Sequence, residues 1–345
     1  MRSSSGAGLL HGRGIGGGPG EGREDGHRTE IGLEQLAEIL QGKITLFLGG
    51  VDTGKSTLIR KVHRLIGGGV LDADLGQSEI GPPTCVSLGD YNHVEESYFV
   101  GDISPRGNFV QLLSAVGQAL RHPKFKRPCL IDTDGYIGDE AARALKGELI
   151  NLVRPDVLVL LQRRGELDYF KLFAWKGLEI LDLYVSHRGS KSREERIRAR
   201  EEAFRRYFQN AEIRRWPLKE LRFERSPIGH GEPVEPALLE KILGCRVVGA
   251  WRTGGELTAV VEGYAQELGA AKGSLQVEYI HLINLHELRN LLVGCLSGGR
   301  LQGLGIVKGL DEEWIEVLTS AKEATVLQAG RLILEEDGSH RRLQA

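Results

Sequence analysis

Residues 44–57 place a glycine-rich loop and a lysine–serine pair directly after an apolar stretch. Gly49 and Gly54, followed by Lys55 and Ser56, match the spacing of the phosphate-binding loop. Inward-pointing backbone N–H groups of such a loop form an anion site, and the helix that follows adds its positive end. We therefore predict a nucleoside triphosphate site with a magnesium ion on Ser56. Its residues are Gly49, Gly50, Val51, Asp52, Thr53, Gly54, Lys55, Ser56 and Thr57.

Two acidic residues lie at the end of the next apolar stretch, in the run Leu-Asp-Ala-Asp-Leu-Gly-Gln over residues 71–77. A carboxylate beyond a strand and next to a phosphate loop can orient magnesium or accept a proton from an attacking hydroxyl. Asp74 suits this role better than Asp72 because it lies just past the strand. The alternative, that Asp72 and Asp74 only cap the following segment, remains open.

A second acidic turn follows the apolar stretch that begins at Cys129, in the run Asp-Thr-Asp-Gly-Tyr over residues 132–136. Asp132 could bind a water molecule held by magnesium, and Thr133 could approach a phosphate through its hydroxyl and amide groups. The alternative is a plain turn that is rich in aspartate and glycine.

Arginines dominate the charged stretch 191–200, where Arg196 and Arg200 are four residues apart and share one face of the predicted helix. Two guanidinium groups on one face can close over a triphosphate and stabilise charge on a transferred group. A solvated helix whose arginines pair with neighbouring glutamates is the alternative.

Short apolar strands alternate with amphipathic helices through the first two thirds of the chain, which predicts a mostly parallel sheet covered by helices on both faces. Ligands of such α/β sheets bind beyond the carboxyl ends of the strands, where the loop, Asp74 and Asp132 fall. The predicted strands are 44–48, 70–73, 98–100, 129–132, 157–161 and 178–184. The predicted helices are 31–40, 55–66, 109–120, 140–152 and 192–208.

Changes in composition divide the 345 residues into three parts. Residues 1–27 are rich in glycine, serine and arginine with few apolar anchors, which predicts a disordered tail. Residues 28–215 form the predicted P-loop domain, with an arginine-rich lid at about 188–210. Residues 216–345 carry β-like segments separated by glycines and polar turns, which predicts a smaller, mainly β domain.

Bulk composition limits the partners of the chain. A net charge of −2 excludes a uniformly basic surface, so any nucleic-acid site must be a local patch. The four cysteines are widely spaced, which is typical of neither a zinc cluster nor a disulfide framework. No apolar run approaches the roughly 20 residues that span a bilayer. We therefore predict no membrane contact and a cytoplasmic location.

These motifs in succession resemble the polynucleotide 5′-hydroxyl kinase family, over about residues 40–210. This family includes the kinase subunit of the eukaryotic pre-mRNA cleavage factor, a ribosomal-RNA processing kinase, and archaeal and bacterial relatives. The block Asp-Ala-Asp-Leu-Gly-Gln-Ser-Glu-Ile-Gly-Pro-Pro at 72–83 is most similar to the archaeal and bacterial members. Residues 98–101, the Ser-Pro-Arg-Gly segment 104–107, and Pro155-Asp156 are also similar to the family.

The resemblance implies transfer of the γ-phosphate of ATP, with Mg²⁺, to the 5′-hydroxyl end of single-stranded or end-exposed RNA or DNA. It implies catalytic roles for Lys55, Asp74, Arg196 and Arg200. Magnesium is assigned to Ser56, Asp74 and Asp132. Substrate contacts are assigned to Asp72, Gln77, Thr133, Asp134, Gly135 and Tyr136. Family members often have Trp where this chain has Tyr136, and Tyr can also pack or stack at that position.

Three other functions are compatible with a phosphate-binding loop. An ATP-binding scaffold of an RNA-processing complex would need little kinase activity, and its protein partners are unknown. A nucleotide-driven switch would hydrolyse GTP or ATP to regulate a partner, and the Asn-Lys-x-Asp motif that selects guanine is absent from this sequence. A small-molecule kinase would ignore long polynucleotides. The β domain is assigned only a general role in substrate handling.

Overall fold

The computed structural model describes residues 10–15, 29–186, 189, 191–265 and 268–343. The chain divides into two compact units, Met1–Arg198 and Ala199–Ala345. The sequence predicts a later boundary, after residue 215. Within the second unit, β10 (Glu212–Pro217), a strand that the sequence reading missed, pairs along its length with β18 (Trp314–Thr319).

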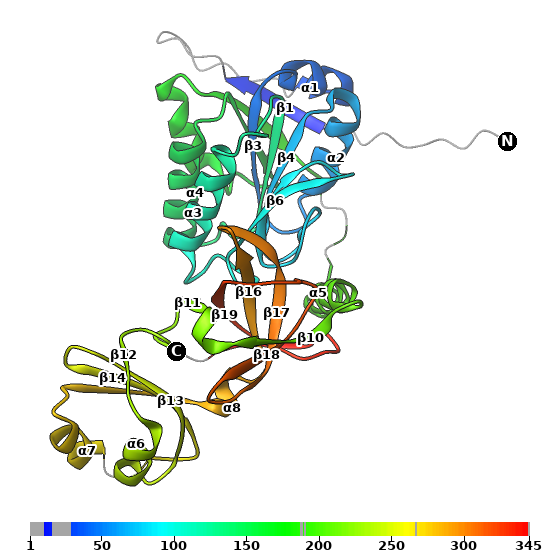
Figure 1. Cartoon of the computed structure of the whole chain (residues 1–345). Helices are drawn as coiled ribbons and strands as arrows, with labels where there is room; N and C mark the ends of the chain where they lie inside the picture. The colour runs from blue at the N-terminus through cyan, green and yellow to red at the C-terminus, as the bar shows by residue number, and fades with distance from the viewer. Residues whose placement is uncertain (1–9, 16–28, 187–188, 190, 266–267, 344–345) are drawn as a thin grey trace. The chain divides into compact units, whose positions relative to one another are not determined.

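The first unit contains a nine-stranded mixed sheet of order β2-β1-β9-β8-β3-β7-β4-β5-β6. Figure 1 shows β1, β3, β4 and β6 of this sheet between the helices of the first unit. Its five central strands, from β9 to β4, are parallel, and both edges are antiparallel. The α/β P-loop fold predicted from the sequence is therefore confirmed. The strands are β1 (Leu10–Ile15), β2 (Thr29–Ile31), β3 (Ile44–Gly49), β4 (Gly69–Ala73), β5 (Cys85–Gly89), β6 (Val94–Phe99), β7 (Cys129–Thr133), β8 (Val157–Gln162) and β9 (Glu179–Tyr184).

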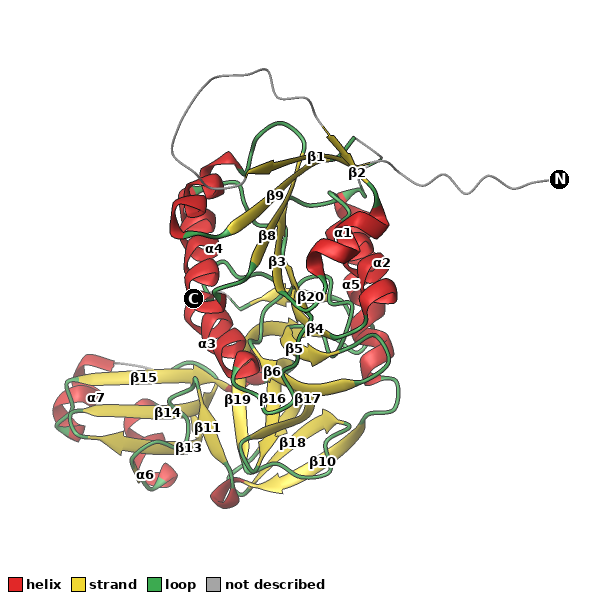
Figure 2. Cartoon of the chain, turned by 90° about the horizontal axis from the view of Figure 1, so that it is seen from above, coloured by secondary structure: helices red, strands yellow, loops and turns green. Residues whose placement is uncertain are grey.

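Helices cover both faces of this sheet. Figure 2 shows α1 and α2 on one side and α3 and α4 on the other. Along β3 the apolar side chains alternate between the two cores, because successive residues of a strand point to opposite faces. Phe47 joins the core beneath α1 and α2, while Leu46 and Leu48 join the other. The helices are α1 (Leu33–Leu40), α2 (Lys55–Ile66), α3 (Phe109–Leu120), α4 (Glu140–Val153), the 3₁₀ helix η1 (Asp168–Lys176) and α5 (Arg193–Phe208).

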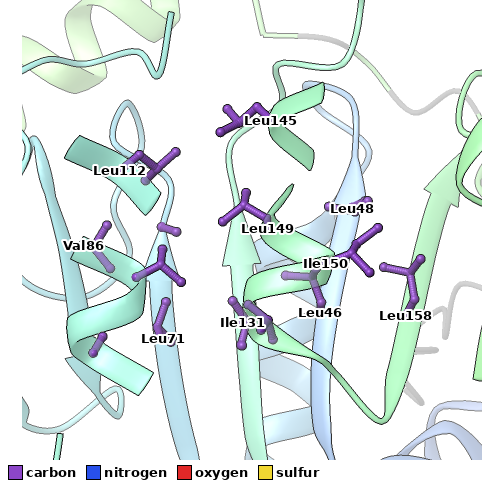
Figure 3. Packing of buried hydrophobic residues seen from close by; sticks show 14 of the residues in the cluster. Leu46, Leu48, Leu71, Val86, Leu112, Ile131, Leu145, Leu149, Ile150 and Leu158 are labelled. Carbon is purple, nitrogen blue, oxygen red and sulfur yellow. The ribbon is translucent and has the colours of Figure 1, made fainter. Parts of the chain in front are cut away.

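The core on the α3 and α4 face fixes the strands that carry the acidic residues. Leu71 of β4 and Ile131 of β7 are buried there, together with Leu112 of α3 and Leu149 of α4 (Figure 3). Burying such side chains contributes about 1.5–3 kcal/mol each. The ends of β4 and β7 are therefore held in register by packing on the residues just before them.

Part of the segment for which we predict disorder forms a strand instead. Leu10–Ile15 is β1, which pairs antiparallel with β9 and places Gly12 opposite Leu183. Strand pairing is made by backbone N–H and C=O groups, so the scarcity of apolar side chains in the segment does not prevent it. The rest of the predicted tail lies outside the described residues.

The second unit is mainly β, as predicted, and contains two sheets. The larger has seven strands, in the order β10-β18-β17-β16-β19-β11 with β20 paired to β19, and the smaller has the order β12-β13-β14-β15. Helices α6 and α7 contact the smaller sheet, a feature the sequence reading missed. The remaining elements are η2 (Leu218–Glu220), β11 (Arg222–Glu224), β12 (Glu232–Pro233), α6 (Pro236–Leu243), β13 (Arg246–Thr253), β14 (Glu256–Glu262), α7 (Leu268–Leu275), β15 (Tyr279–Asn284), α8 (Leu285–Leu288), β16 (Leu291–Ser297), β17 (Arg300–Leu310), β19 (Val326–Leu334) and β20 (His340–Arg342).

Within the described residues, no helix combines the length and the apolar character that crossing a bilayer requires. All four cysteines are free thiols.

Candidate phosphoryl-transfer site

The phosphate-binding loop connects β3 to α2, as the sequence predicts. Gly54 has φ +86°, a left-handed conformation that favours glycine. The Lys55 ammonium is buried and donates hydrogen bonds to the carbonyl oxygens of Gly49 (2.9 Å) and Gly50 (3.4 Å), while the Thr53 hydroxyl also donates to Gly50 O at 2.9 Å. The charge of Lys55 is therefore held over the loop, next to the start of the helix.

Three aspartates gather at the carboxyl ends of β4 and β7. These strands are parallel neighbours, with Asp72 opposite Asp132 and Ala73 opposite Thr133. Burial raises the pKa of Asp132 to about 6, although Lys55 and a hydrogen bond with the Ser56 hydroxyl oppose the shift. Burial, together with the charges of Asp132 and Asp74, raises the pKa of Asp72 well above its usual range. The concentration of negative charge favours a cation at this edge.

The carboxylates of Asp72 and Asp74 accept different sets of hydrogen bonds. Asp72 accepts hydrogen bonds from the backbone N–H of Asp74 (2.9 Å), Glu79 (2.6 Å) and Ile80 (3.1 Å), and from the Ser78 hydroxyl at 3.2 Å. It thus fixes the course of residues 74–80. These contacts favour the capping role left open for Asp72 and make it a positioning residue.

Asp74 keeps one carboxylate oxygen available. Its Oδ1 accepts from the backbone N–H of Gly76 and Gln77, both at 3.0 Å, and Oδ2 has no hydrogen-bond partner among the described residues. Burial and the charge of Asp134 raise the pKa of Asp74, whereas the nearby charge of Lys55 lowers it. Asp74 and Lys55 therefore share one electrostatic environment, as expected for a base beside a phosphate site.

The residues present fit a magnesium ion. Mg²⁺ is usually bound through one or two carboxylates, with phosphate oxygens and water completing the octahedron. Ser56 and Asp132 supply a hydroxyl and a carboxylate that already contact each other. Across the part of the chain that the structure describes, no three His, Cys, Asp or Glu side chains form a metal-binding group. This donor set suits an ion that arrives with a nucleotide better than a resident metal.

The turn after β7 lies against the phosphate-binding loop. A Cβ atom on Gly135 would come within 2.6 Å of Val51 Cγ2 and 2.7 Å of Val51 N, so only glycine permits this approach. The Thr133 hydroxyl donates to Phe47 O (2.9 Å) and its amide donates to the Asp132 carboxylate (2.8 Å). Both groups through which Thr133 was expected to reach a phosphate are thus engaged within the fold.

A buried lysine that sequence reasoning missed holds the same turn. Lys146 of α4 is fully buried, and its ammonium lies 2.8 Å from the Asp134 carboxylate and 3.2 Å from Asp134 O. The carboxylate also accepts from the amide of Tyr136 at 2.8 Å. Asp134, predicted to contact substrate, is therefore committed to an internal ion pair that shapes the turn.

Tyr136 is oriented by two charged neighbours. Its hydroxyl donates to Asp139 Oδ1 at 2.6 Å, and Arg106 Nε donates to that hydroxyl at 3.3 Å. The Arg106 guanidinium lies 5.4 Å from the ring centre and also pairs with Asp139, which caps α4 through the amide of Ala142. The Ser-Pro-Arg-Gly segment thus supplies an exposed cation beside the ring.

Asp52 connects the phosphate-binding loop to the arginine-rich helix α5. Its carboxylate lies 3.0 Å from Arg196 Nη1, which also donates to Lys191 O at 2.8 Å. Its carbonyl accepts from Arg163 Nη2 at 2.6 Å, and its φ is +58°, an uncommon conformation for a non-glycine residue. The loop, the end of β8 and the start of α5 therefore meet at one aspartate.

The two arginines of the predicted lid pair fall in different units. Arg196 belongs to the first unit, where Asp52 holds it, and Arg200 lies one turn later on α5, within the second unit. A joint role for the two arginines stays a prediction.

Two residues that sequence reasoning missed could have been identified from their positions in the sequence. Arg163 directly follows β8, so it occupies the same kind of strand-end position that identified Asp74 and Asp132. Lys146 lies between Leu145 and Leu149 on the buried side of α4, and a lysine there needs a buried partner.

We expect Asp132→Asn to stabilise the protein near neutral pH. A carboxylate whose pKa is raised on folding contributes stability below its unfolded pKa, about 3.9, and that contribution is lost as pH rises through about 6. The variant should therefore gain about 1–3 kcal/mol of unfolding free energy at about pH 8 and much less at about pH 4.5. Urea unfolding at both pH values tests this, and an equal change at both would contradict it.

Lys146→Met should destabilise the protein by about 3–5 kcal/mol, because it leaves the Asp134 carboxylate buried without its cation. Adding Asp134→Asn should restore much of the loss. The matched control is Lys61→Met, which removes an exposed lysine of α2. Unfolding free energies of the four proteins form the test. A double variant no more stable than Lys146→Met would show that the pair is not coupled.

Asp52→Asn should loosen the start of α5, because the amide keeps the size of the side chain but not the charge that attracts Arg196. Amide hydrogen exchange across residues 193–198 should quicken at least severalfold, as expected for loss of a charge-assisted hydrogen bond of about 1–3 kcal/mol. Glu202→Gln, which removes the exposed partner of Arg205 on the same helix, is the control. Exchange at the wild-type rate would show that Asp52 is not a tether.

Comparison with known proteins agrees with this geometry. The family described as mRNA cleavage and polyadenylation factor CLP1 P-loop matches residues 49–210. A solved structure of Clp1p in complex with Pcf11p superposes with a TM-score of 0.54 at 13% identity, covering 86% of this chain and 78% of that one. At this identity the structural likeness establishes the fold alone.

Archaeal sequences are similar over nearly the whole chain. A polyribonucleotide 5′-hydroxyl-kinase of Pyrococcus horikoshii is 30% identical over 337 residues, 89% of this chain and 90% of the relative. One of Pyrococcus furiosus is 31% identical over 341 residues, 90% of this chain and 92% of the relative. With the phosphate-binding loop and the strand-end aspartates in place, the chain belongs to the polyribonucleotide 5′-hydroxyl-kinase family.

Proposed function

We propose that this protein transfers the γ-phosphate of ATP to the 5′-hydroxyl end of RNA, and of DNA where it is offered. The observation that carries the proposal is the meeting of Lys55, Asp74 and Asp132 where β3, β4 and β7 end. Phosphoryl transfer asks a protein mainly for alignment and charge neutralisation, and these groups supply both. The archaeal relatives named for this activity support it.

In the reaction, a bond forms between the 5′ oxygen and the γ-phosphorus while the bond from that phosphorus to the β–γ bridging oxygen breaks. Asp74 orients the hydroxyl and accepts its proton, for which its free Oδ2 and raised pKa suit it. Lys55 holds the donor phosphates over the loop. Since Asp74 must be ionised to accept a proton, the rate should fall as pH drops through its raised pKa.

Ser56 and Asp132 would hold the magnesium ion, and Asp74 lies near enough to add charge there. Bound Mg²⁺ neutralises negative charge on the β- and γ-phosphates as the transfer proceeds. The buried carboxylates fit this need, because a cation offsets the cost of keeping them ionised out of water.

Arginines and the turn after β7 complete the proposed site. Arg196, released from Asp52, would stabilise the equatorial oxygens of the transferred group. The role of Arg200 beside it stays the prediction made from the sequence. The turn at Gly135 and Tyr136 would hold the polynucleotide beside the loop, and Gln77 would lie near the reacting end. Asp72, Thr133 and Asp134 act by positioning these groups, since their own polar atoms are engaged.

An ATP-binding scaffold with little kinase activity is the alternative. The solved Clp1p structure is a complex with Pcf11p, and this is the observation that favours a scaffold. The available Oδ2 of Asp74 and the position of Arg196 beside the phosphate-binding loop favour the kinase for this chain. Protein partners and the cytoplasmic location stay predictions.

Asp74→Asn and Lys55→Ala should each lower kcat at least on the order of a hundredfold. Asp74→Asn removes the proton acceptor without removing a phosphate contact, so its KM for ATP should stay near the wild-type value. Glu38→Gln, an exposed carboxylate-to-amide change on α1, serves as the control.

The assay follows transfer from γ-labelled ATP to 5′-hydroxyl oligonucleotides of RNA and DNA. A wild-type rate in Asp74→Asn would remove that residue from the chemistry. A wild-type protein that binds ATP but phosphorylates neither polymer would favour the scaffold.

A further inference from the structure

The second unit contains a cavity that the proposed reaction does not use. Its volume is about 370 Å³, which is within the range of small-molecule sites, about 300–1,000 Å³. It lies between the end of β14, the short helix α8 with its flanks, and β17. The lining residues on which the argument depends are Tyr264, His286, Leu288, Arg289, Lys308 and Leu310.

Hydrogen bonds fix two walls of this cavity against each other. The Asn284 amide donates to Gly263 O at 2.7 Å, and its carbonyl oxygen accepts from the backbone of His286. On the opposite side, the backbone of Asn290 donates to Val307 O at 2.7 Å. The segment around α8 is thus tied to β14 at one end and to β17 at the other, so the cavity is built into the fold.

The charged groups of the lining divide into two kinds. Lys308 pairs with Glu336 (2.8 Å) and donates to Asn290, and Glu262 pairs with Arg246 (2.9 Å). The Arg289 side chain, by contrast, is exposed and forms no ion pair or hydrogen bond within the described ranges. The uncompensated charge of the lining is therefore positive.

An aromatic ring and an apolar floor lie beside this charge. Tyr264 is 87% exposed, so the face of its ring is open to a stacking partner. Leu288 and Leu310 line the interior. A ring for stacking, an apolar floor and a free guanidinium form the combination by which proteins bind single-stranded nucleic acid.

We propose that this cavity binds one unpaired nucleotide of the polynucleotide substrate, with its base stacked on Tyr264 and its phosphate contacted by Arg289. The inference rests on the proposed function and adds a second contact for the chain that is phosphorylated. It gives the second unit a defined role in holding single-stranded RNA.

Equilibrium binding of a fluorescent, single-stranded 5′-hydroxyl RNA of about 15 nucleotides, without ATP, tests the inference. Replacing both Tyr264→Ala and Arg289→Ala should weaken binding roughly tenfold or more, since stacking on one aromatic ring alone is worth about 1–3 kcal/mol. The KM for this RNA should rise in parallel. The control is Tyr279→Ala with Arg222→Ala, which removes an exposed tyrosine and an exposed arginine of the same unit outside the cavity.

Ultraviolet cross-linking of the same RNA carrying 4-thiouridine gives a second readout. A cross-link on or beside Tyr264 would support the inference. Unchanged RNA affinity in the cavity variant, an equal loss of affinity in the control variant, or cross-links confined to residues outside the cavity would overturn it. RNA binding is measured without turnover. A wild-type protein that binds RNA at this cavity but phosphorylates none would therefore contradict the proposed function and leave the inference about the cavity standing.

Discussion

Buried negative charge at the ends of β4 and β7 is the constraint on which the rest of the site depends. Asp72, Asp74 and Asp132 lie where a triphosphate and a polynucleotide, both anionic, are expected to meet. Such an arrangement is stable only where cations are provided nearby. Lys55 lies over the loop for this purpose, and the need for further positive charge explains why an arginine-bearing helix begins beside Asp52.

Elements that lie away from the strand ends also help to balance the charge of the site. The parallel register of β4 and β7 sets Asp72 opposite Asp132, and the core of α3 and α4 holds that register. Lys146 neutralises Asp134 from inside the protein, so the turn that carries Gly135 can lie against the loop. Packing, ion pairing and the proposed catalysis therefore depend on the same few strand ends.

Much of the fold and of the candidate site was predictable from the sequence, because strand ends and glycine spacing are determined by residues close together in the chain. The phosphate-binding loop, helix α2 and the strand-end position of Asp74 depend only on residues close in sequence. The partners of individual side chains were harder to predict from the sequence. The Asp134–Lys146 pair joins a loop to a helix, and the engagement of the Thr133 hydroxyl with Phe47 O joins two strands, so only the folded chain shows them. The antiparallel edge at β5 was missed because Cys85–Gly89 is short and lacks the alternation of a half-buried strand.

The charge balance can be measured directly by carbon-13 NMR titration of the Asp74 and Asp132 carboxylates, in the wild-type protein and in Lys55→Ala. Both pKa values should lie above the ordinary aspartate value in the wild type, and both should rise further when the lysine is removed, because Lys55 lowers each of them. Ordinary pKa values in the wild type, or values that do not respond to the loss of Lys55, would contradict the account.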